Sequence, residues 1–147
     1  MSVEHTIQFR VRYGEVDQMG VVHHSRYLSY FEMGRVELMR SVGLPHAAQE
    51  DRGEPQSIRS VDVRYASPAR YDDVLELTTR VPEARGAQVV FESRLWRIEP
   101  GPRALVAEST QVGVAVTADG KVRRLTPREL AALGAPPRSR ATRQPSP

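Results

Sequence analysis

Residues 25–42 read SRYLSYFEMGRVELMRSV, and they decide the fold because the rest of the chain must cover one side of the helix they predict. The apolar stripe of this helix consists of four residues: Tyr27, Phe31, Gly34 and Leu38. A spacing of three or four residues places them on one face, which is typical of a helix packed against a core. Ser25 is a suitable N-cap, and Gly43 with Pro45 forms a typical helix stop.

Gly34 stands in the middle of this helix, where glycine costs about 1 kcal/mol relative to alanine. A close contact between the helix and a sheet would explain why no side chain is present there. The alternative is a glycine that the helix merely tolerates.

Outward from the helix, most of the chain predicts strands. Alternation of apolar and polar residues together with turn signals predicts five of them: residues 6–13, 56–65, 74–82, 88–98 and 103–117. We expect an irregularity near Ser60 in the second strand and an end near Pro82 in the third. Short helical segments are expected over residues 46–53 and from Thr126 to about Leu133, the latter beginning with a capping box.

The order of these elements predicts an α+β domain with a five-stranded, mostly antiparallel sheet that wraps around one long helix. Residues 1–134 are expected to form this single domain. From residue 135 onward the chain contains Pro, Arg, Ser and Thr with almost nothing to bury. Residues 135–147 are therefore predicted to be a disordered Pro/Arg-rich tail.

The composition excludes several classes of protein. The 147 residues contain no cysteine, which rules out a disulfide scaffold, a thiol nucleophile and a cysteine-based metal site. No apolar run is long enough to span a bilayer, and the first ten residues lack the apolar core of a signal peptide, so we expect a cytoplasmic protein. The net charge of +3 lies entirely in Arg138, Arg140 and Arg143, which is a weak footprint for a nucleic-acid partner.

An unusual cluster of polar residues lies between the end of the first strand and the start of the helix. Its members are Tyr13, Glu15, Asp17, Gly20, His23, His24, Tyr27 and Glu32. The first turn of a helix has free N–H groups and the positive end of the dipole, so it can polarise a carbonyl or hold an oxyanion. A carboxylate just before this turn, such as Asp17, could act as a nucleophile or a general base. The cluster indicates acyl transfer or hydrolysis.

The same residues have less specific interpretations. Asp17 could be an ordinary turn residue, and His23 and His24 could be surface residues of a loop. A metal site at the histidine pair is disfavoured because adjacent side chains diverge and no third ligand is suggested. The charges of the helix are interpreted as solvated ion pairs among Glu32, Arg35, Glu37 and Arg40.

Residues 13–32, YGEVDQMGVVHHSRYLSYFE, closely resemble the signature of the 4-hydroxybenzoyl-CoA thioesterase-like hotdog family, which includes the small bacterial acyl-CoA thioesterases found alongside the Tol–Pal system. The shared pattern is Tyr, three residues, Asp, two residues, Gly, a Val pair, then His and Tyr leading into a long helix. The similarity continues in residues 43–45 and 65–75 and covers about residues 5–130. It implies the hotdog fold, with five antiparallel strands around one long central helix.

The resemblance also implies roles by position. Asp17 matches the catalytic carboxylate, and Tyr13 and His24 match the residues that accompany it. The implied substrate-binding residues are Gly20, Val21, Val22, His23 and Tyr27. The backbone amides of Val22, His23 and His24 at the helix start would polarise the thioester carbonyl.

The function that the resemblance implies is hydrolysis of an acyl-CoA to a free acid and CoA, with neither a metal nor a cofactor. Asp17 would attack the thioester carbonyl directly or activate a water, and the sequence leaves both open. Members of the family work as homodimers, often paired into homotetramers, with sites at the subunit interface. Arg59, Arg64 and Arg70 are candidates for binding the nucleotide phosphates of CoA.

Three alternatives accompany this hypothesis. The substrate could be a thioester of an acyl-carrier protein, or the chain could be a non-catalytic protein that binds acyl-CoA or acts as a scaffold. Glu32 is a minor candidate for the catalytic carboxylate, because another hotdog branch takes this group from the helix. Hydratase chemistry is disfavoured, because residues 18–20 are Gln-Met-Gly where hotdog dehydratases have Asn-Pro.

Overall fold

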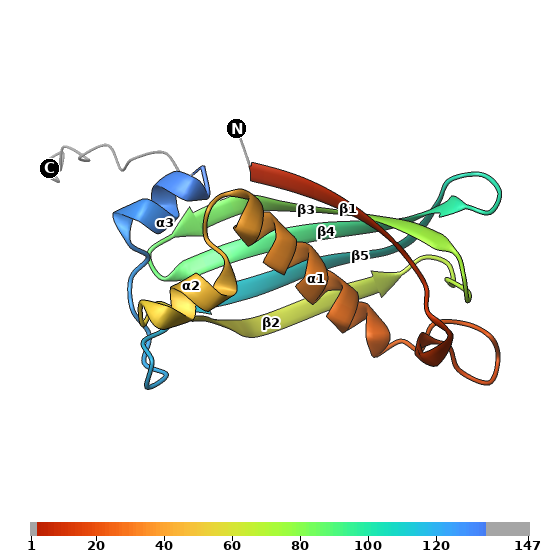
Figure 1. The fold of residues 1–147 in the computed structure, drawn as a ribbon, viewed down its shortest axis with the longest axis horizontal. Helices are drawn as coiled ribbons and strands as arrows, with labels where there is room; N and C mark the ends of the chain where they lie inside the picture. The colour runs from red at the N-terminus through yellow and green to blue at the C-terminus, as the bar shows by residue number, and fades with distance from the viewer. Residues whose placement is uncertain (1–2, 135–147) are drawn as a thin grey trace, which may run out of the picture.

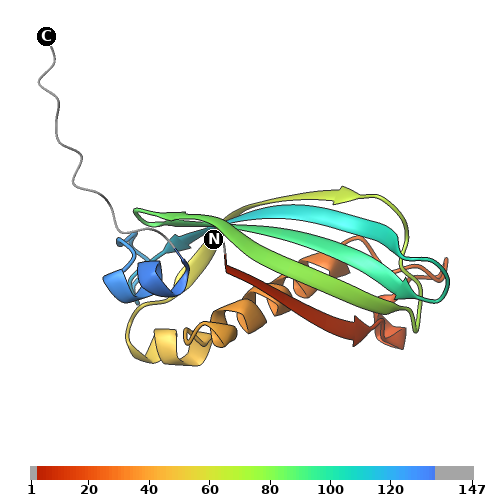
Figure 2. The ribbon, with the colours of Figure 1, turned by 90° about the horizontal axis from the view of Figure 1, so that it is seen from above.

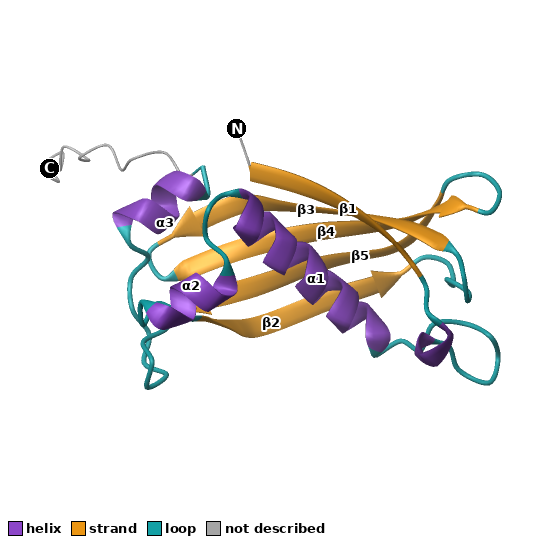
Figure 3. Cartoon of the chain, in the orientation of Figure 1, coloured by secondary structure: helices purple, strands orange, loops and turns teal. Residues whose placement is uncertain are grey.

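The computed structural model describes residues 3–134 of the chain (Figure 1 and Figure 3). Its elements, in chain order, are β1 (Val3–Arg10), α1 (Arg26–Ser41), α2 (His46–Asp51), β2 (Gln56–Tyr65), β3 (Val74–Arg85), β4 (Gln88–Glu99), β5 (Ala104–Ala115) and α3 (Pro127–Ala132). The predicted tail, residues 135–147, lies outside the described residues.

The five strands form one antiparallel sheet in the order β1-β3-β4-β5-β2. β1 pairs with β3 from Val3↔Val81 to Arg10↔Val74, and β2 pairs with β5 at the opposite edge. β3, β4 and β5 follow one another as neighbours, so the segment that contains α1 and α2 joins the two edge strands. The predicted α+β class and the five-stranded antiparallel sheet are confirmed.

The helices lie in a defined arrangement against this sheet. α1 has 16 residues and runs along one face of the sheet, as the view from above shows (Figure 2). α2 and α3 lie at one end of the molecule, and the loop between β1 and α1 lies at the other (Figure 1). In the described part of the chain, no helix is both long and apolar enough to span a membrane.

Three strand boundaries differ from the prediction by three residues, since β1 begins at Val3 and ends at Arg10 and β3 ends at Arg85. β1 ends at Arg10 because Tyr13–Glu15 form a single 3-10 turn. β3 continues past Pro82 to Arg85, since its pairing register with β4 shifts between Arg80 and Glu83, around the proline.

Other local predictions are confirmed. The register of β2 shifts between Ile58 and Ser60, where the irregularity was expected. A short helix, α2, occupies most of residues 46–53. α3 begins with the predicted capping box, in which the Thr126 hydroxyl accepts from the Glu129 N–H at 3.1 Å and the Glu129 carboxylate accepts from the Thr126 N–H at 3.0 Å.

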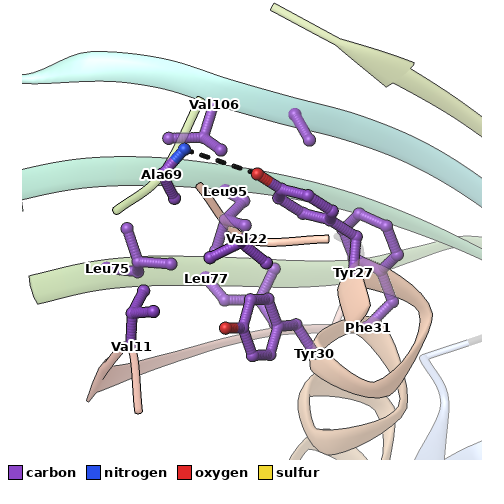
Figure 4. Packing of buried hydrophobic residues seen from close by; sticks show 11 residues of the cluster. Val11, Val22, Tyr27, Tyr30, Phe31, Ala69, Leu75, Leu77, Leu95 and Val106 are labelled. Atoms are coloured by element: carbon purple, nitrogen blue, oxygen red, sulfur yellow. Dashed lines mark hydrogen bonds between the residues drawn. The ribbon is translucent and has the colours of Figure 1, made fainter. Parts of the chain in front are cut away.

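The core consists of two apolar clusters between α1 and the sheet. The first lies at the N-terminal end of α1 and contains Val11, Val22, Tyr27, Tyr30, Phe31, Ala69, Leu75, Leu77, Leu95, Val106 and Ala107 (Figure 4). The second lies toward α2 and α3 and contains Leu38, Met39, Leu44, Val81, Val89, Phe91, Ala115, Leu125 and Leu133. Burial of both clusters fixes α1 on the sheet.

A row of buried polar residues separates the two clusters. Thr79, Ser93 and Ser109 pair directly across β3, β4 and β5, and all three are buried. Above the row, Arg35 Nη1 donates to Gln111 Oε1 at 3.1 Å, and Gln111 Nε2 donates to Ser109 Oγ at 2.8 Å. We refer to these five residues as the polar row.

The polar row corrects the prediction for the charges of the helix. Arg35 does not form a solvated ion pair, because its guanidinium is drawn toward Gln111, and burial lowers the pKa of Arg35 below its usual value. The expected kind of pair does occur between Arg40 and Glu37, at 3.4 Å on the exposed side of α1.

Gly34 lies directly over the polar row. A Cβ at this position would overlap the Thr79 hydroxyl and would lie only 2.8 Å from Leu77 Cδ2. The close contact between helix and sheet that was predicted from the sequence is confirmed, and the helix-breaking cost of glycine is offset by this approach.

Gly34→Leu is expected to lower the free energy of unfolding by about 1–3 kcal/mol or more, since this is the usual cost of overpacking a core. Thermal unfolding followed by circular dichroism measures the effect. Ser29→Leu is the matched control, because Ser29 is on the exposed face of the same helix. Equal melting temperatures for the two variants would contradict the tight contact.

Candidate active site

The loop that carries the candidate residues is folded back on itself. Val16 pairs with Val22, and Val21 pairs with Arg70 of the segment between β2 and β3. At the tip, the Asp17 N–H donates to Val21 O at 2.8 Å and the Gly20 N–H donates to Asp17 O at 2.9 Å. Gly20 has a φ of 79°, which favours glycine and allows this tight reversal.

The Asp17 carboxylate is held by its own loop. Oδ1 accepts from the Met19 N–H at 2.8 Å and from the Val21 N–H at 3.4 Å. The side chain is half-buried, and within residues 3–134 neither a salt bridge nor a hydrogen bond to Oδ2 is present. One carboxylate oxygen therefore fixes the geometry while the other is available for chemistry.

Backbone amides between the loop tip and the helix start were expected to polarise a carbonyl. Two of the three are already used, since the Val22 N–H donates to Ala69 O at 2.8 Å and the His23 N–H donates to Glu15 O at 3.1 Å. The prediction for the Val22 and His23 amides is thus corrected, because the loop needs them to hold its own fold. Among the described residues, the His24 N–H has no partner, so of these three amides it alone remains available.

His23 and His24 lie side by side at the surface, with ring centroids 4.1 Å apart. His23 Nδ1 lies 2.7 Å from Ser25 Oγ. Ser25 occupies the N-cap position, as predicted, but its hydroxyl bonds the His23 ring and does not cap the helix. Across residues 3–134, no group of three or more His, Cys, Asp or Glu side chains is arranged to hold a metal ion.

The two candidate tyrosines lie in different environments. Tyr13 is 79% exposed and packs edge-to-face against Tyr71, with ring centroids 5.5 Å apart. Tyr27 is buried in the first core cluster, where its hydroxyl accepts from the Ala69 N–H at 3.4 Å, and burial raises its pKa. Tyr13 is therefore accessible to a ligand, whereas Tyr27 is covered by its neighbours in the core.

Glu15 organises the site, although the sequence pattern assigns it no specific role. Its Oε1 accepts from the Arg12 N–H at 2.7 Å and from the Tyr30 hydroxyl at 3.0 Å. Burial and the neighbouring Glu15 charge raise the pKa of Tyr30, which keeps its hydroxyl protonated as a donor. The sequence signal is weak, because a glutamate in a loop has many possible partners and Tyr30 is 15 residues away.

Glu32, the alternative carboxylate, is exposed on α1 and makes no hydrogen bond or salt bridge within the described residues.

A polar groove of about 790 Å³ lies elsewhere, over the strands of the sheet, and no residue from 13 to 27 lines it. Four acidic and four arginine side chains line this groove, so their formal charges cancel. This groove is therefore separate from the candidate loop.

Comparison with known proteins identifies the class. Residues 11–137 match the thioesterase-like superfamily, and the chain belongs to it. The resemblance to hotdog thioesterases drawn from residues 13–32 is confirmed.

Similar proteins include enzymes with named substrates. The chain is 33% identical over 125 residues to acyl-CoA thioesterase YbgC of Haemophilus influenzae, covering 84% of this chain and 88% of the relative. It is 29% identical over 123 residues to a chloroplastic acyl-acyl carrier protein thioesterase of Arabidopsis thaliana, covering 84% and 63%. The structure of 4-hydroxybenzoyl-CoA thioesterase from a Pseudomonas superposes with a TM-score of 0.76 at 27% identity, covering 84% and 93%.

Glu15→Ala is expected to destabilise the protein by about 1–3 kcal/mol, because it leaves the buried Tyr30 hydroxyl without its acceptor. Denaturant unfolding of Glu15→Ala, Tyr30→Phe and the double variant measures the coupling. The double variant should lose less stability than the sum of the single losses. Strict additivity would show that the two side chains do not interact.

Proposed function

We propose that this protein is an acyl-CoA thioesterase that hydrolyses the thioester to a free carboxylic acid and CoA. Membership in the thioesterase-like superfamily and the similarity to acyl-CoA thioesterase YbgC support the proposal. The observation that carries it is the pairing, in one short loop, of a carboxylate with an available oxygen and an amide without a partner among the described residues.

Asp17 is the reactive group in this proposal, and two routes are compatible with it. In one, a carboxylate oxygen attacks the thioester carbon, the C–S bond breaks, the CoA thiolate leaves and is protonated, and water then hydrolyses the acyl–aspartyl anhydride. In the other, Asp17 takes a proton from a water that attacks the carbonyl, and the same C–S bond breaks. Both routes pass through an oxyanion on the thioester carbonyl.

The His24 N–H is the donor that we assign to this oxyanion. It lies two residues before the start of α1, where the helix dipole adds positive potential. Preorganised backbone donors of this type stabilise charge as it develops in the transition state.

The neighbouring residues complete the site. The side chain of His24 and the exposed Tyr13 border the reacting group, and Gly20 and Val21 leave the backbone accessible. Val22 and Tyr27 are buried and support the loop from the core, and the His23 amide ties the loop to Glu15. Arg70 is the best placed of the three candidates for the phosphates of CoA, because its backbone pairs with Val21.

A second copy of this chain is the partner that we propose. β2 is an edge strand with nearly every residue exposed, including Ile58, Val61 and Tyr65. Exposed apolar edge strands are usually covered. A partner at this edge would also help to cover exposed residues of the loop such as Tyr13, since ligand sites are generally enclosed.

The assembly and the cellular location of the protein belong to this proposal. In a homodimer or homotetramer, α1 would be the central helix of each hotdog unit, with the sheet curved around it. We also assign the enzyme to the cytoplasm.

A carrier-protein thioester is the second candidate substrate. The similarity to the chloroplastic acyl-acyl carrier protein thioesterase supports it. Both substrates present the same phosphopantetheine thioester, so one loop can serve either. A non-catalytic binding protein is less well supported, because binding alone does not require a half-buried carboxylate.

Asp17→Asn is expected to lower kcat at least about a hundredfold, the usual contribution of an acid, base or nucleophile. The amide oxygen can still accept from the Met19 and Val21 N–H groups, so the fold of the loop should survive. Thiol release from acetyl- to palmitoyl-CoA, benzoyl-CoA and matching carrier-protein thioesters measures activity. Asp51→Asn, at the exposed end of α2, is the matched control. Turnover by Asp17→Asn close to that of wild type would refute the assignment.

Replacing Ile58 and Val61 together with Glu is expected to convert the oligomer to monomers, because charges would enter the proposed interface. Size-exclusion chromatography with light scattering reports the mass, and thiol release should fall in parallel. Val122→Glu is the control, since Val122 is exposed in the loop after β5. A monomeric wild-type protein, or an unchanged mass of the double variant, would exclude β2 as the interface.

A further inference from the structure

The free amide of His24 belongs to a residue whose carbonyl is held from a distant strand. The Tyr65 hydroxyl donates to His24 O at 2.9 Å. Tyr65 is the last residue of β2 and lies 41 positions further along the chain. Asp17, by contrast, is held by the turn in which it lies, and within residues 3–134 no other segment bonds it.

The ring of Tyr65 has a defined position of its own. It packs edge-to-face on Tyr27, with ring centroids 5.1 Å apart and an interplanar angle of 72°. Tyr27 is 3% exposed, and its hydroxyl accepts from the Ala69 N–H, as the dashed line in Figure 4 shows. Ala69 O in turn accepts from the Val22 N–H at 2.8 Å.

These contacts form a closed circuit around the start of α1. It runs from Val22 through Ala69, Tyr27 and Tyr65 to His24, two residues from its origin. Because Tyr27 belongs to the first core cluster, the circuit ties the His24 peptide to the rigid part of the molecule. Without the hydroxyl of Tyr65, His24 O would have no hydrogen-bond partner among the described residues. The His24 N–H would then be held only through the preceding peptide, where the Arg26 N–H donates to His23 O at 2.9 Å.

We propose that Tyr65 is a positioning residue for thioester hydrolysis, because its hydroxyl fixes the His24 backbone so that the free N–H is aimed at the developing oxyanion. This inference rests on the proposed thioesterase activity. An oxyanion donor is effective because it is oriented before the reaction, so that no reorganisation is needed in the transition state. A small displacement of such a group is sufficient to slow catalysis.

Because Tyr65 is partly exposed, its role in catalysis can be distinguished from a role in stability. The side chain is 52% exposed within one chain, and loss of the hydroxyl keeps the ring that would face a partner at β2, so water can replace the hydroxyl at the His24 carbonyl with little loss of folding free energy. Water does not hold the peptide in one orientation. Loss of the hydroxyl should therefore affect the transition state much more than stability or substrate binding.

Tyr65→Phe removes the hydroxyl and keeps the ring on Tyr27. We expect kcat to fall about tenfold, less than the hundredfold or more for loss of an oxyanion donor itself. KM should stay within about twofold, as for a group that acts only in the transition state, and the melting temperature within about 2 °C, as for a surface substitution. Tyr71→Phe is the matched control, because Tyr71 is equally exposed and its hydroxyl makes no hydrogen bond within the described residues.

An infrared measurement provides a readout that a structural role would not change. In the Asp17→Asn background, the carbonyl of a bound, isotope-labelled acyl-CoA should absorb at lower frequency than in water, because the His24 N–H polarises it. Adding Tyr65→Phe should shift this band back toward its frequency in water.

The outcomes are distinguishable. If wild-type protein hydrolyses no thioester of either class, the proposed function fails and this inference fails with it. If wild type is active and Tyr65→Phe retains its full kcat, or loses activity only in proportion to a lowered melting temperature, the role of Tyr65 alone is overturned. If adding Tyr65→Phe leaves the carbonyl band at the frequency it has in Asp17→Asn alone, the role of Tyr65 is overturned as well.

Discussion

The contact of Gly34 with Leu77 and Thr79 sets the height of α1 above the sheet. A side chain at position 34 would lift the middle of the helix, and both ends would move with it. Tyr27 and Tyr30 would then lose their packing in the first core cluster. Glu15 would lose the hydrogen bond that it accepts from the Tyr30 hydroxyl. The loop that carries Asp17 is thus placed by a close approach more than two helical turns away.

The polar row and the two apolar clusters hold α1 on the sheet in different ways. The clusters supply the burial that drives packing, but apolar contacts alone specify a helix position loosely. The bond from Arg35 to Gln111, continued to Ser109, has a direction and therefore fixes the rotation and register of the helix. That constraint is useful in a protein whose proposed oxyanion donor, the His24 N–H, lies just before the start of the same helix.

Local patterns in the sequence predicted most of the fold, whereas hydrogen bonds between residues far apart in the sequence could not be predicted. Alternation found the strands, and Gly34 indicated the tight contact because its cost within a helix has to be offset by packing. The strand through Pro82 was ended too early, since a register shift cannot be seen in one strand alone. In the loop, Asp17 and Gly20 stand out by type and spacing. The use of the Val22 amide depends on Ala69, and the hydrogen bond of Tyr65 to His24 joins residues 41 positions apart.

The order of strands in the sheet has a consequence for how the chain acquires its shape. β3, β4 and β5 are joined by short turns and can form as a meander from neighbouring residues. β1 has to wait for β3, because Val3 pairs with Val81, and β2 has to wait for β5. Closure of such long loops makes folding slow. During synthesis on a ribosome, both edge strands and the candidate loop between them emerge before β3 and β5, the strands that receive them, so the loop is made before the sheet that orders it.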